Sequence, residues 1–262
     1  MADRAAQRQA ARDAAEAAAS VVRHRWNDAT ATTAEEKGAG DYVTAVDREA
    51  EAAAIAVLRE RTPDIEVLAE ERGGSRQSRM WVVDPVDGTT NLVRGFPVVG
   101  VSVALLEEGR PVVGAVAAPQ LDAAWSAADG EGAADARGRP LRIADRPPSR
   151  AIVATGFPFK RKDEPVLARY ISAFEAGLVA FEDLRRAGAA SLDLAYTANA
   201  TFDGFFELGL SLWDIAAGAL LVREAGGVVT DWAGDPDQVF TSGDIIAGSP
   251  RCHEAMLEIA RP

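Results

Sequence analysis

The apolar residues of this chain follow two different patterns, and the change between them near residue 145 limits what the chain can fold into. Before the change, short apolar runs at 97–106 and 111–118 flank turn-forming residues at 107–110, which predicts a β-hairpin. A further run at 123–127 predicts a third strand beside it. We therefore expect the first half to contain two helices followed by mainly antiparallel strands.

The second half alternates strand-like and helix-like segments, which is typical of a layered α/β structure. Residues 1–145 are expected to form an N-terminal α+β half and residues 146–262 a C-terminal α/β half, in one compact unit with the functional site between them. The expected helices are 1–26, 47–61, 165–178, 192–200, 214–225 and 253–260; the other expected strands are 65–69, 80–83, 152–155, 202–208, 228–231 and 245–247; and loops are expected at 29–40 and 128–140.

The charge balance narrows the possible partners. The chain has 28 Lys and Arg against 40 Asp and Glu, a net charge of −12. Nucleic-acid-binding faces are usually basic because they contact phosphates, so no nucleic-acid partner is expected. No stretch approaches the roughly 20 apolar residues of a membrane span, and the N-terminus lacks the apolar core of a targeting peptide. The expected location is the cytoplasm.

The scarcity of cysteine and histidine limits the chemistry. One cysteine cannot form an intrachain disulfide, and two histidines are too few for a histidine-rich zinc site. A bound metal would depend on oxygen ligands, which favours Mg²⁺, Mn²⁺ or Ca²⁺ over zinc or copper.

The segment WVVDPVDGTT at 81–90 carries the most chemical information. An apolar strand is expected to end at Asp84, and Pro85 fixes a turn that lets Asp84 and Asp87 converge. If residues 88–90 open a helix, their N–H groups are available to an anion such as phosphate. Carboxylates that can bind a cation would then lie beside amides that can bind an anion. This arrangement suits a metal-bridged phosphate. The alternative is that both Asp residues only form a turn and Thr89 caps a helix.

Three other acidic segments allow the same two interpretations. They are Glu70 and Glu71 after a short apolar run, Asp214 at the start of a helix, and Asp41, Thr44 and Asp47 where a loop enters a helix. Each one alone is an ordinary loop or capping residue. Taken together in this order, they favour one acidic site.

The ordered segments resemble the motifs of the inositol monophosphatase family. The resemblance rests on DYVTAVD at 41–47, LAEE at 68–71, WVVDPVDGTTN at 81–91 and WDIAAG at 213–218, and it extends over nearly the whole chain. The family comprises Mg²⁺-dependent, lithium-sensitive phosphatases, and the bacterial-type inositol-1-monophosphatases are the most similar branch. The resemblance implies an αβαβα sandwich, of the type shared with fructose-1,6-bisphosphatase, and a homodimer.

The resemblance also implies roles for the matched residues, with two to three Mg²⁺ per site and Mn²⁺ as an alternative. One Mg²⁺ would be held by Glu70, Asp84 and the carbonyl of Val86, and a second by Asp84, Asp87 and Asp214. Water near Glu70 and Thr89 would be the nucleophile, with Asp84 also in the catalytic set. Substrate contacts are implied for Asp87, Gly88, Thr89, Ala190, Asp193, Glu207 and Asp214, and an orienting role for Asp41, Thr44, Asp47 and Glu71.

The implied activity is hydrolysis of a small phosphorylated polyol or related phosphate monoester, with myo-inositol 1-phosphate as the first candidate. Metal ions would neutralise the phosphate and activate water. Histidinol phosphate, fructose 1,6-bisphosphate and 3′-phosphonucleotides remain alternatives, because the metal motifs do not distinguish them. A non-catalytic regulatory protein is disfavoured because every implied ligand is present, and a Ca²⁺-binding module because the chain lacks EF-hand spacing.

Overall fold

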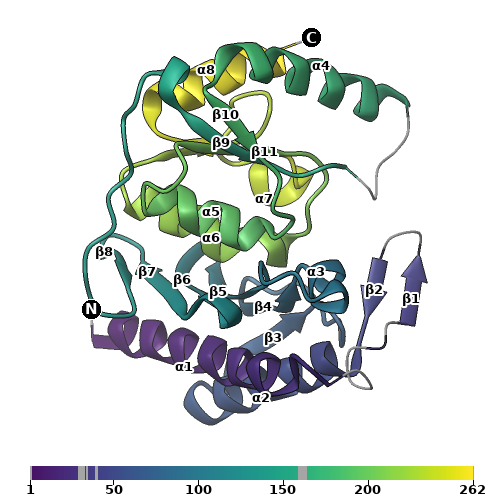
Figure 1. Ribbon diagram of the computed structural model, residues 1–262. Coiled ribbons are helices and arrows are strands. Elements are labelled where there is room, and N and C mark those ends of the chain that lie inside the picture. The colour runs from purple at the N-terminus through teal and green to yellow at the C-terminus, as the bar shows by residue number, and fades with distance from the viewer. Residues whose placement is uncertain (1, 29–32, 34, 39–40, 159–163, 262) are drawn as a thin grey trace.

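The computed structural model describes residues 2–28, 33, 35–38, 41–158 and 164–261, and its elements are stacked in five layers (Figure 1). The lowest layer in the figure is a pair of helices, α1 (Ala2–Arg25) and α2 (Ala45–Arg61), which pack along one another. The buried side of α1 consists largely of alanines, including Ala11, Ala14 and Ala18. Because alanine is small and favours helix, the two helices approach closely.

The second layer is a sheet that, within the described residues, has six strands in the order β3-β4-β5-β6-β7-β8. Its strands are β3 (Glu66–Ala69), β4 (Arg79–Asp87), β5 (Gly100–Glu107), β6 (Arg110–Ala118), β7 (Ala123–Ala128) and β8 (Gly132–Asp135). Only β3 and β4 pair in parallel among these neighbours. The predicted hairpin is confirmed as β5 and β6, with Glu107 opposite Arg110.

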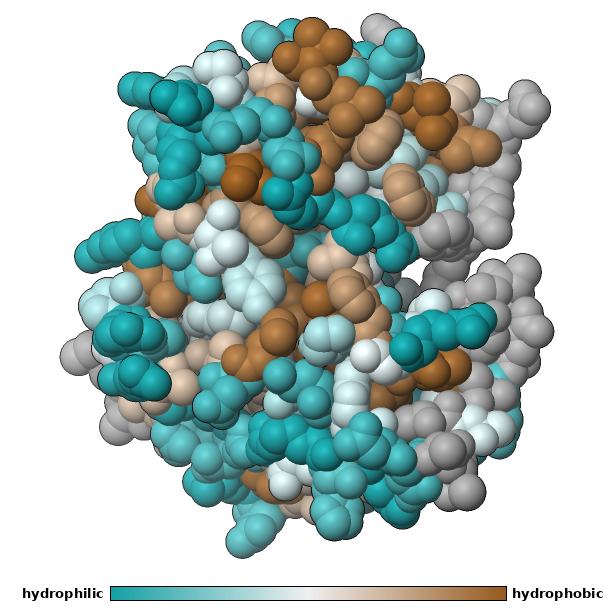
Figure 2. Space-filling view, in the orientation of Figure 1, coloured by the Kyte–Doolittle hydropathy of each residue, from teal (hydrophilic) through white to brown (hydrophobic). Residues whose placement is uncertain are grey.

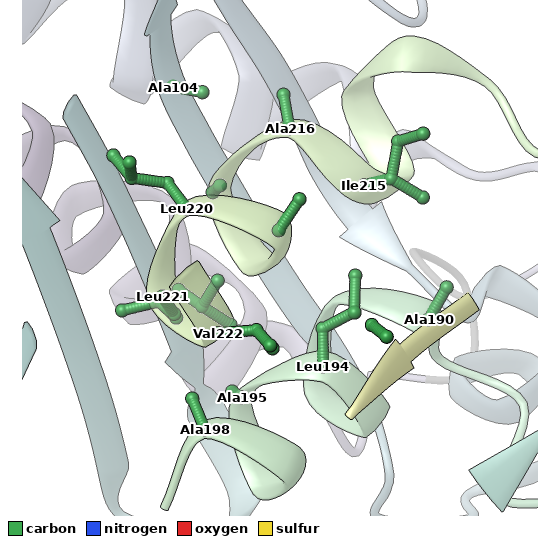
Figure 3. Packing of buried hydrophobic residues seen from close by; sticks show 14 of the residues in the cluster. Ala104, Ala190, Leu194, Ala195, Ala198, Ile215, Ala216, Leu220, Leu221 and Val222 are labelled. Carbon is green, nitrogen blue, oxygen red and sulfur yellow. The ribbon is translucent and has the colours of Figure 1, made fainter. Parts of the chain in front are cut away.

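The third layer contains α5 (Ala190–Ala198) and α6 (Leu212–Glu224), which lie between two sheets (Figure 1). A helix covered on both sides needs apolar residues around most of its circumference. Residues 215–222 of α6 are all buried, as this position requires. Figure 3 shows Leu220 and Leu221 of α6 in one buried cluster with Ala104 of β5 and Leu194 of α5, so this core cluster joins segments from both halves of the chain.

The upper two layers are a second sheet and a last pair of helices. Within the described residues this sheet has the order β10-β9-β11-β13-β12. Its strands are β9 (Ile152–Thr155), β10 (Asp183–Arg185), β11 (Gly204–Glu207), β12 (Val228–Thr230) and β13 (Ile245–Gly248), and the helices above it are α4 (Glu164–Ala180) and α8 (Pro250–Ala260). The predicted αβαβα sandwich is confirmed. No helix in the described part of the chain is long and apolar enough to cross a membrane.

The structure corrects three expectations about local elements. The strand expected to end at Asp84 continues as β4 to Asp87, with an irregular register between these two residues. The expected loop 29–40 contains β1 (Glu35–Gly38), which pairs with β2 (Asp41–Val43), and the expected loop 128–140 contains β8. Backbone hydrogen bonds to a neighbouring strand form these short strands, and their polar and small residues give no alternating apolar pattern.

The surface over α4 is partly apolar. Figure 2 shows brown atoms gathered over this helix at the top of the molecule. Four of its apolar side chains are exposed, namely Leu167, Ile171, Leu178 and Val179. The predicted homodimer stays a prediction, because the structure contains a single chain.

Candidate active site

A cavity of about 430 Å³ lies where the end of β4, the end of β11 and the start of α6 meet. The short helix α3 (Thr89–Arg94) also borders it. Of the predicted site residues, those that line it are Glu70, Asp84, Val86, Asp87, Gly88, Thr89, Ala190, Glu207 and Asp214. The fold therefore gathers residues separated by up to 144 positions in the sequence around one space.

The last residues of β4 bring two carboxylates into this cavity. Asp84 is 1% exposed, and its Oδ1 accepts a hydrogen bond from the N–H of Val86 at 2.9 Å. Asp87 Oδ2 accepts hydrogen bonds from the N–H of Ser191 at 2.7 Å and from its hydroxyl at 2.5 Å. The irregular register between Asp84 and Asp87 redirects the strand, because Pro85 has no N–H with which to continue a regular ladder.

The turn after β4 requires glycine at position 88. Gly88 has φ 94° and ψ 41°, a left-handed conformation, and a Cβ there would lie 3.1 Å from the carbonyl oxygen of Val98. The side-chain amide of Asn91 fixes the following turn by donating to the carbonyls of Val98 at 2.7 Å and Ala187 at 3.0 Å. The first N–H groups of a helix have no acceptor within the helix, so the start of α3 presents donors at the cavity.

Thr89 connects α3 to α2. Its hydroxyl lies 3.0 Å from Oδ1 of Asp47 and 3.1 Å from the carbonyl oxygen of Val86, both acceptors. The other carboxylate oxygen of Asp47 accepts from the N–H of Thr44 at 2.9 Å, and the Thr44 hydroxyl accepts from Val46 N–H in return. Asp47 thus caps α2 and holds Thr89 at the same time.

Glu70 and Glu71 follow β3, and they have different surroundings. Glu70 lines the cavity, and its N–H donates to the carbonyl of Val83 at 3.2 Å. The N–H of Glu71 donates to the buried carboxylate of Glu51 at 2.8 Å, as does that of Arg72 at 3.1 Å. Glu51 of α2 therefore fixes the turn that carries Glu70.

Asp214 is placed by the start of α6. Its Oδ2 accepts from the N–H of Ser211 at 2.7 Å, a helix-capping contact. The preceding carbonyl, that of Trp213, accepts from the hydroxyl of Ser102 on β5 at 2.8 Å. This hydrogen bond attaches the start of α6 to β5, and the strand next to β5, β4, carries Asp84.

Ala190 and Glu207 also line the cavity, and the N–H of Ala190 hydrogen-bonds to the carboxylate of Asp87. Glu207 lies so close to Gly156 that a Cβ at this glycine would come within 2.0 Å of its carboxylate. Asp193 is buried and does not belong to the cavity lining, and its Oδ1 has no hydrogen-bond partner among the described residues. Asp41 begins β2, and its side chain lies outside what the structure describes.

Burial and mutual repulsion raise the pKa values of carboxylates around the cavity. Burial raises the pKa of Asp84 well above its ordinary value, and the negative charges of Glu70, Asp87 and Asp214 raise it further. Burial and Asp214 raise the pKa of Asp87 to about 7, although its hydrogen bonds from Ser191 act in the opposite direction. The pKa of Glu207 is raised for the same kind of reason, with burial as the largest cause.

Such a set of carboxylates fits a divalent cation in donor type and in charge. Oxygen ligands suit Mg²⁺, and a cation would offset the repulsion that raises these pKa values. Among the described residues, no three His, Cys, Asp or Glu side chains already converge as a ligand group. The carboxylates therefore surround the cavity without forming a closed ligand shell.

Comparison with known proteins decides the family. The model of the inositol monophosphatase family matches residues 3–262. The chain belongs to the inositol monophosphatase family. A curated member from Pseudomonas aeruginosa, named Nus factor SuhB, is 43% identical over 233 residues, which cover 87% of this chain and 85% of the relative.

Two solved structures show the same fold. The suhB protein of Bartonella henselae is 34% identical, covers 95% of both chains and has a TM-score of 0.86. An inositol monophosphatase from Anabaena is 32% identical, covers 99% of this chain and 96% of its own, and has a TM-score of 0.86. The family resemblance expected from the motifs is confirmed over the whole length.

Four residues at the site were not predicted. Ser191 binds Asp87, Glu51 holds the turn after Glu70, Gly156 leaves room for Glu207, and Arg186 lines the cavity. The sequence carries a weak signal for Glu51, which is an acidic residue on the otherwise apolar face of α2 that includes Ala50 and Ala54. The others depend on contacts between segments distant in the sequence.

Proposed function

We propose that this chain is a Mg²⁺-dependent phosphatase of small phosphate monoesters, with myo-inositol 1-phosphate as the first candidate substrate. The observation that carries the proposal is the composition of one cavity, in which Glu70, Asp84, Asp87 and Asp214 face the N–H groups at the start of α3. A phosphate ester needs both kinds of group, because carboxylates hold the cations that neutralise its charge and N–H groups orient its oxygens.

The ligands proposed for Mg²⁺ are Glu70, Asp84, Asp87, Asp214 and the carbonyl of Val86. Bound Mg²⁺ would supply charge neutralisation of the phosphate and activation of water. The hydrogen bonds from Val86 to Asp84, from Ser191 to Asp87 and from Ser211 to Asp214 hold these side chains in place. Ordering the ligands before binding reduces the cost of assembling the site.

Glu70 and Thr89 are proposed to hold the attacking water, and Asp47 to orient Thr89. Because the Thr89 hydroxyl donates its hydrogen to acceptors within the protein, its oxygen lone pairs are left to accept a hydrogen bond from water in the cavity. Asp47 is the proton acceptor behind Thr89, as in other arrangements where a buried carboxylate orients a hydroxyl. The orienting role predicted for Asp47 is thus supported by its contact with Thr89.

Glu207 is proposed to bind the alcohol part of the substrate. It lines the cavity, and its carboxylate would accept hydrogen bonds from hydroxyl groups of a polyol. Arg186 lines the same cavity and adds a donor there. Carboxylate and guanidinium groups together suit a substrate with several hydroxyls, which favours a polyol phosphate over a purely apolar ester.

The Pseudomonas relative carries the name Nus factor SuhB, which does not mention hydrolysis. We propose hydrolysis for this chain because all the proposed ligands line one cavity. The cytoplasmic location, the homodimer and the lack of a nucleic-acid partner stay predictions.

The test is a phosphate-release assay with the purified protein over inositol, histidinol, sugar and nucleotide phosphates. We expect Mg²⁺-dependent release, fastest from myo-inositol 1-phosphate, with inhibition by Li⁺ and loss of activity in excess EDTA. Equal release in EDTA would refute the metal mechanism. No release from any ester with Mg²⁺ or Mn²⁺ would refute the proposed function, and preference for another ester would change only the substrate.

A further inference from the structure

A second cavity, of about 660 Å³, lies away from the carboxylates. It is formed where the start of β4, the turn between β5 and β6, and helices α6 and α7 (Val239–Ser242) meet. Ligand-binding cavities commonly measure about 300–1,000 Å³, so this one has room for a small organic molecule. Leu212 lines it, whereas Leu210 and Asp214 line the first cavity, so the segment that opens α6 separates the two.

Three arginines line this second cavity, in a chain whose net charge is −12. They are Arg76, Arg110 and Arg223. Glu108 and Asp237 also line the space, and Asp237 binds Arg110 at 2.8 Å. Two carboxylates against three guanidinium groups leave an excess positive charge around the cavity.

Arg223 is built into the wall of the cavity. Its guanidinium carbon lies 5.4 Å from the centroid of the Phe240 ring, and its Nη2 donates to the carbonyl of Pro236 at 3.1 Å. Burial lowers its pKa and the positive charge of Arg110 lowers it further, whereas the negative charges of Asp237 and Asp129 act in the opposite direction. A bound anion beside Arg110 and Arg223 would add to the effect of these carboxylates in offsetting the repulsion between the two cations.

Besides these charged residues and the polar side chains Gln77 and Thr241, the lining includes four large apolar side chains. Met80, Leu106, Leu212 and Phe240 contribute carbon surface from β4, β5, α6 and α7. These four side chains are 1–8% exposed, and an apolar ligand body in the cavity would cover what remains of their accessible surface. The lining thus suits a molecule that has both an acidic group and an apolar body.

We propose that the second cavity binds a small organic anion, with its acidic group at Arg110 and Arg223 and its apolar body against Leu212 and Phe240. The proposal is independent of phosphatase activity, because it concerns a different cavity with the opposite charge. Without a divalent cation, the carboxylates of the first cavity repel anions, so binding measured in EDTA reports on the second cavity.

The test uses the fluorescent anion anilinonaphthalene sulfonate, titrated into the full chain in EDTA. We expect saturable binding of one molecule, weakened by added salt because screening acts on charge pairs. Combined substitution of Arg76→Gln and Arg110→Gln, both exposed positions, is expected to weaken binding about fivefold or more, the effect of about 1 kcal/mol.

Two controls make the result decisive. Arg251→Gln removes an exposed arginine of α8 that pairs with Asp145 outside the cavity, and binding should stay unchanged. Neutral phenylnaphthylamine, which lacks the sulfonate, should bind more weakly than the anion. Absence of saturable binding, equal effects of all the arginine substitutions, or equal binding of the neutral compound would each overturn the proposal.

Discussion

The hydroxyl oxygen of Thr89 lies 3.0 Å from Oδ1 of Asp47, and this contact joins the start of α3 to the start of α2. The same carboxylate caps α2 through Thr44, so one buried side chain serves the helix and the cavity together. Burial raises the pKa of Asp47, whereas the hydrogen bonds from Thr44 and Thr89 lower it. A substitution of Thr89 or Asp47 is therefore expected to disturb the other residue as well.

Removal of the Thr89 hydroxyl tests its proposed role with water. Thr89→Val keeps the shape of the side chain but cannot hold a water or donate to Asp47, so we expect kcat to fall by about 100-fold or more. Thr89→Ser retains the hydroxyl and should keep most of the activity. Steady-state kinetics with saturating Mg²⁺ measures both. Similar kcat values for the valine and serine variants would contradict the role.

Replacement of Asp84 separates catalysis from stability. Asp84→Asn should lower kcat by about 100-fold or more, because a charged ligand of the proposed cation is lost. In EDTA the variant should melt at the same temperature as the native chain or higher, because a buried charge repelled by Glu70, Asp87 and Asp214 is removed. Thermal melting with and without Mg²⁺ checks this. Near-native activity at saturating Mg²⁺, or a Mg²⁺-induced rise in Tm equal to that of the native chain, would show that Asp84 is not a ligand.

Stability of the metal-free protein should depend on pH through Asp87. The pKa of this residue is raised from 3.8 to about 7 in the folded chain, first by burial and then by Asp214. Between these values the folded state holds a proton that the unfolded state has released, so the contribution of Asp87 to stability is lost as pH rises through about 7.

Denaturant unfolding in EDTA at a series of pH values from about 5 to 8 measures this effect. The native chain should lose stability relative to Asp87→Asn as the pH rises. A constant difference between the two proteins over this range would contradict the assignment.

The close approach of Gly156 to Glu207 predicts an effect on substrate binding. In Gly156→Ala the new methyl group would occupy the space of the Glu207 carboxylate, which must rotate away. We expect kcat/KM to fall by about tenfold, the value of a lost hydrogen bond to a charged group. Gly177→Ala in α4 is the matched control, because its nearest contact would be an ordinary 3.5 Å. Equal kinetics for both variants would show that Glu207 does not contact the substrate.

Much of the fold could be predicted from local patterns. The hairpin of β5 and β6 follows from two apolar runs around a turn, and α6 follows from an apolar segment that ends at two glycines. The strand β8 was missed because its residues, Gly132–Asp135, have neither a β-branched side chain nor an alternating pattern. The segment forms a strand because it pairs with the edge of an existing sheet, and its own sequence does not indicate that pairing.

The site was predictable to the extent that it lies within motifs. Asp84, Asp87, Gly88 and Thr89 lie within six consecutive positions, 84–89, and their spacing alone indicates a carboxylate group beside free amides. Ser191 stands 104 positions away from its partner Asp87, and although substrate contacts were implied for its neighbours Ala190 and Asp193, nothing local indicates the hydrogen bond to Asp87. Only the packing of α5 against the end of β4 reveals it.

The sequence by itself determined most of the helices and longer strands, the excess of oxygen ligands over nitrogen and sulfur ligands, and the family. Local propensities and consecutive side chains carry these properties, so they are present in the chain before it folds. The tertiary structure alone decided that Thr89 meets Asp47, that Glu207 fills the space left by Gly156, and that three arginines surround a second cavity. Such contacts join segments that are distant in the chain, so they form only when the layers pack against one another.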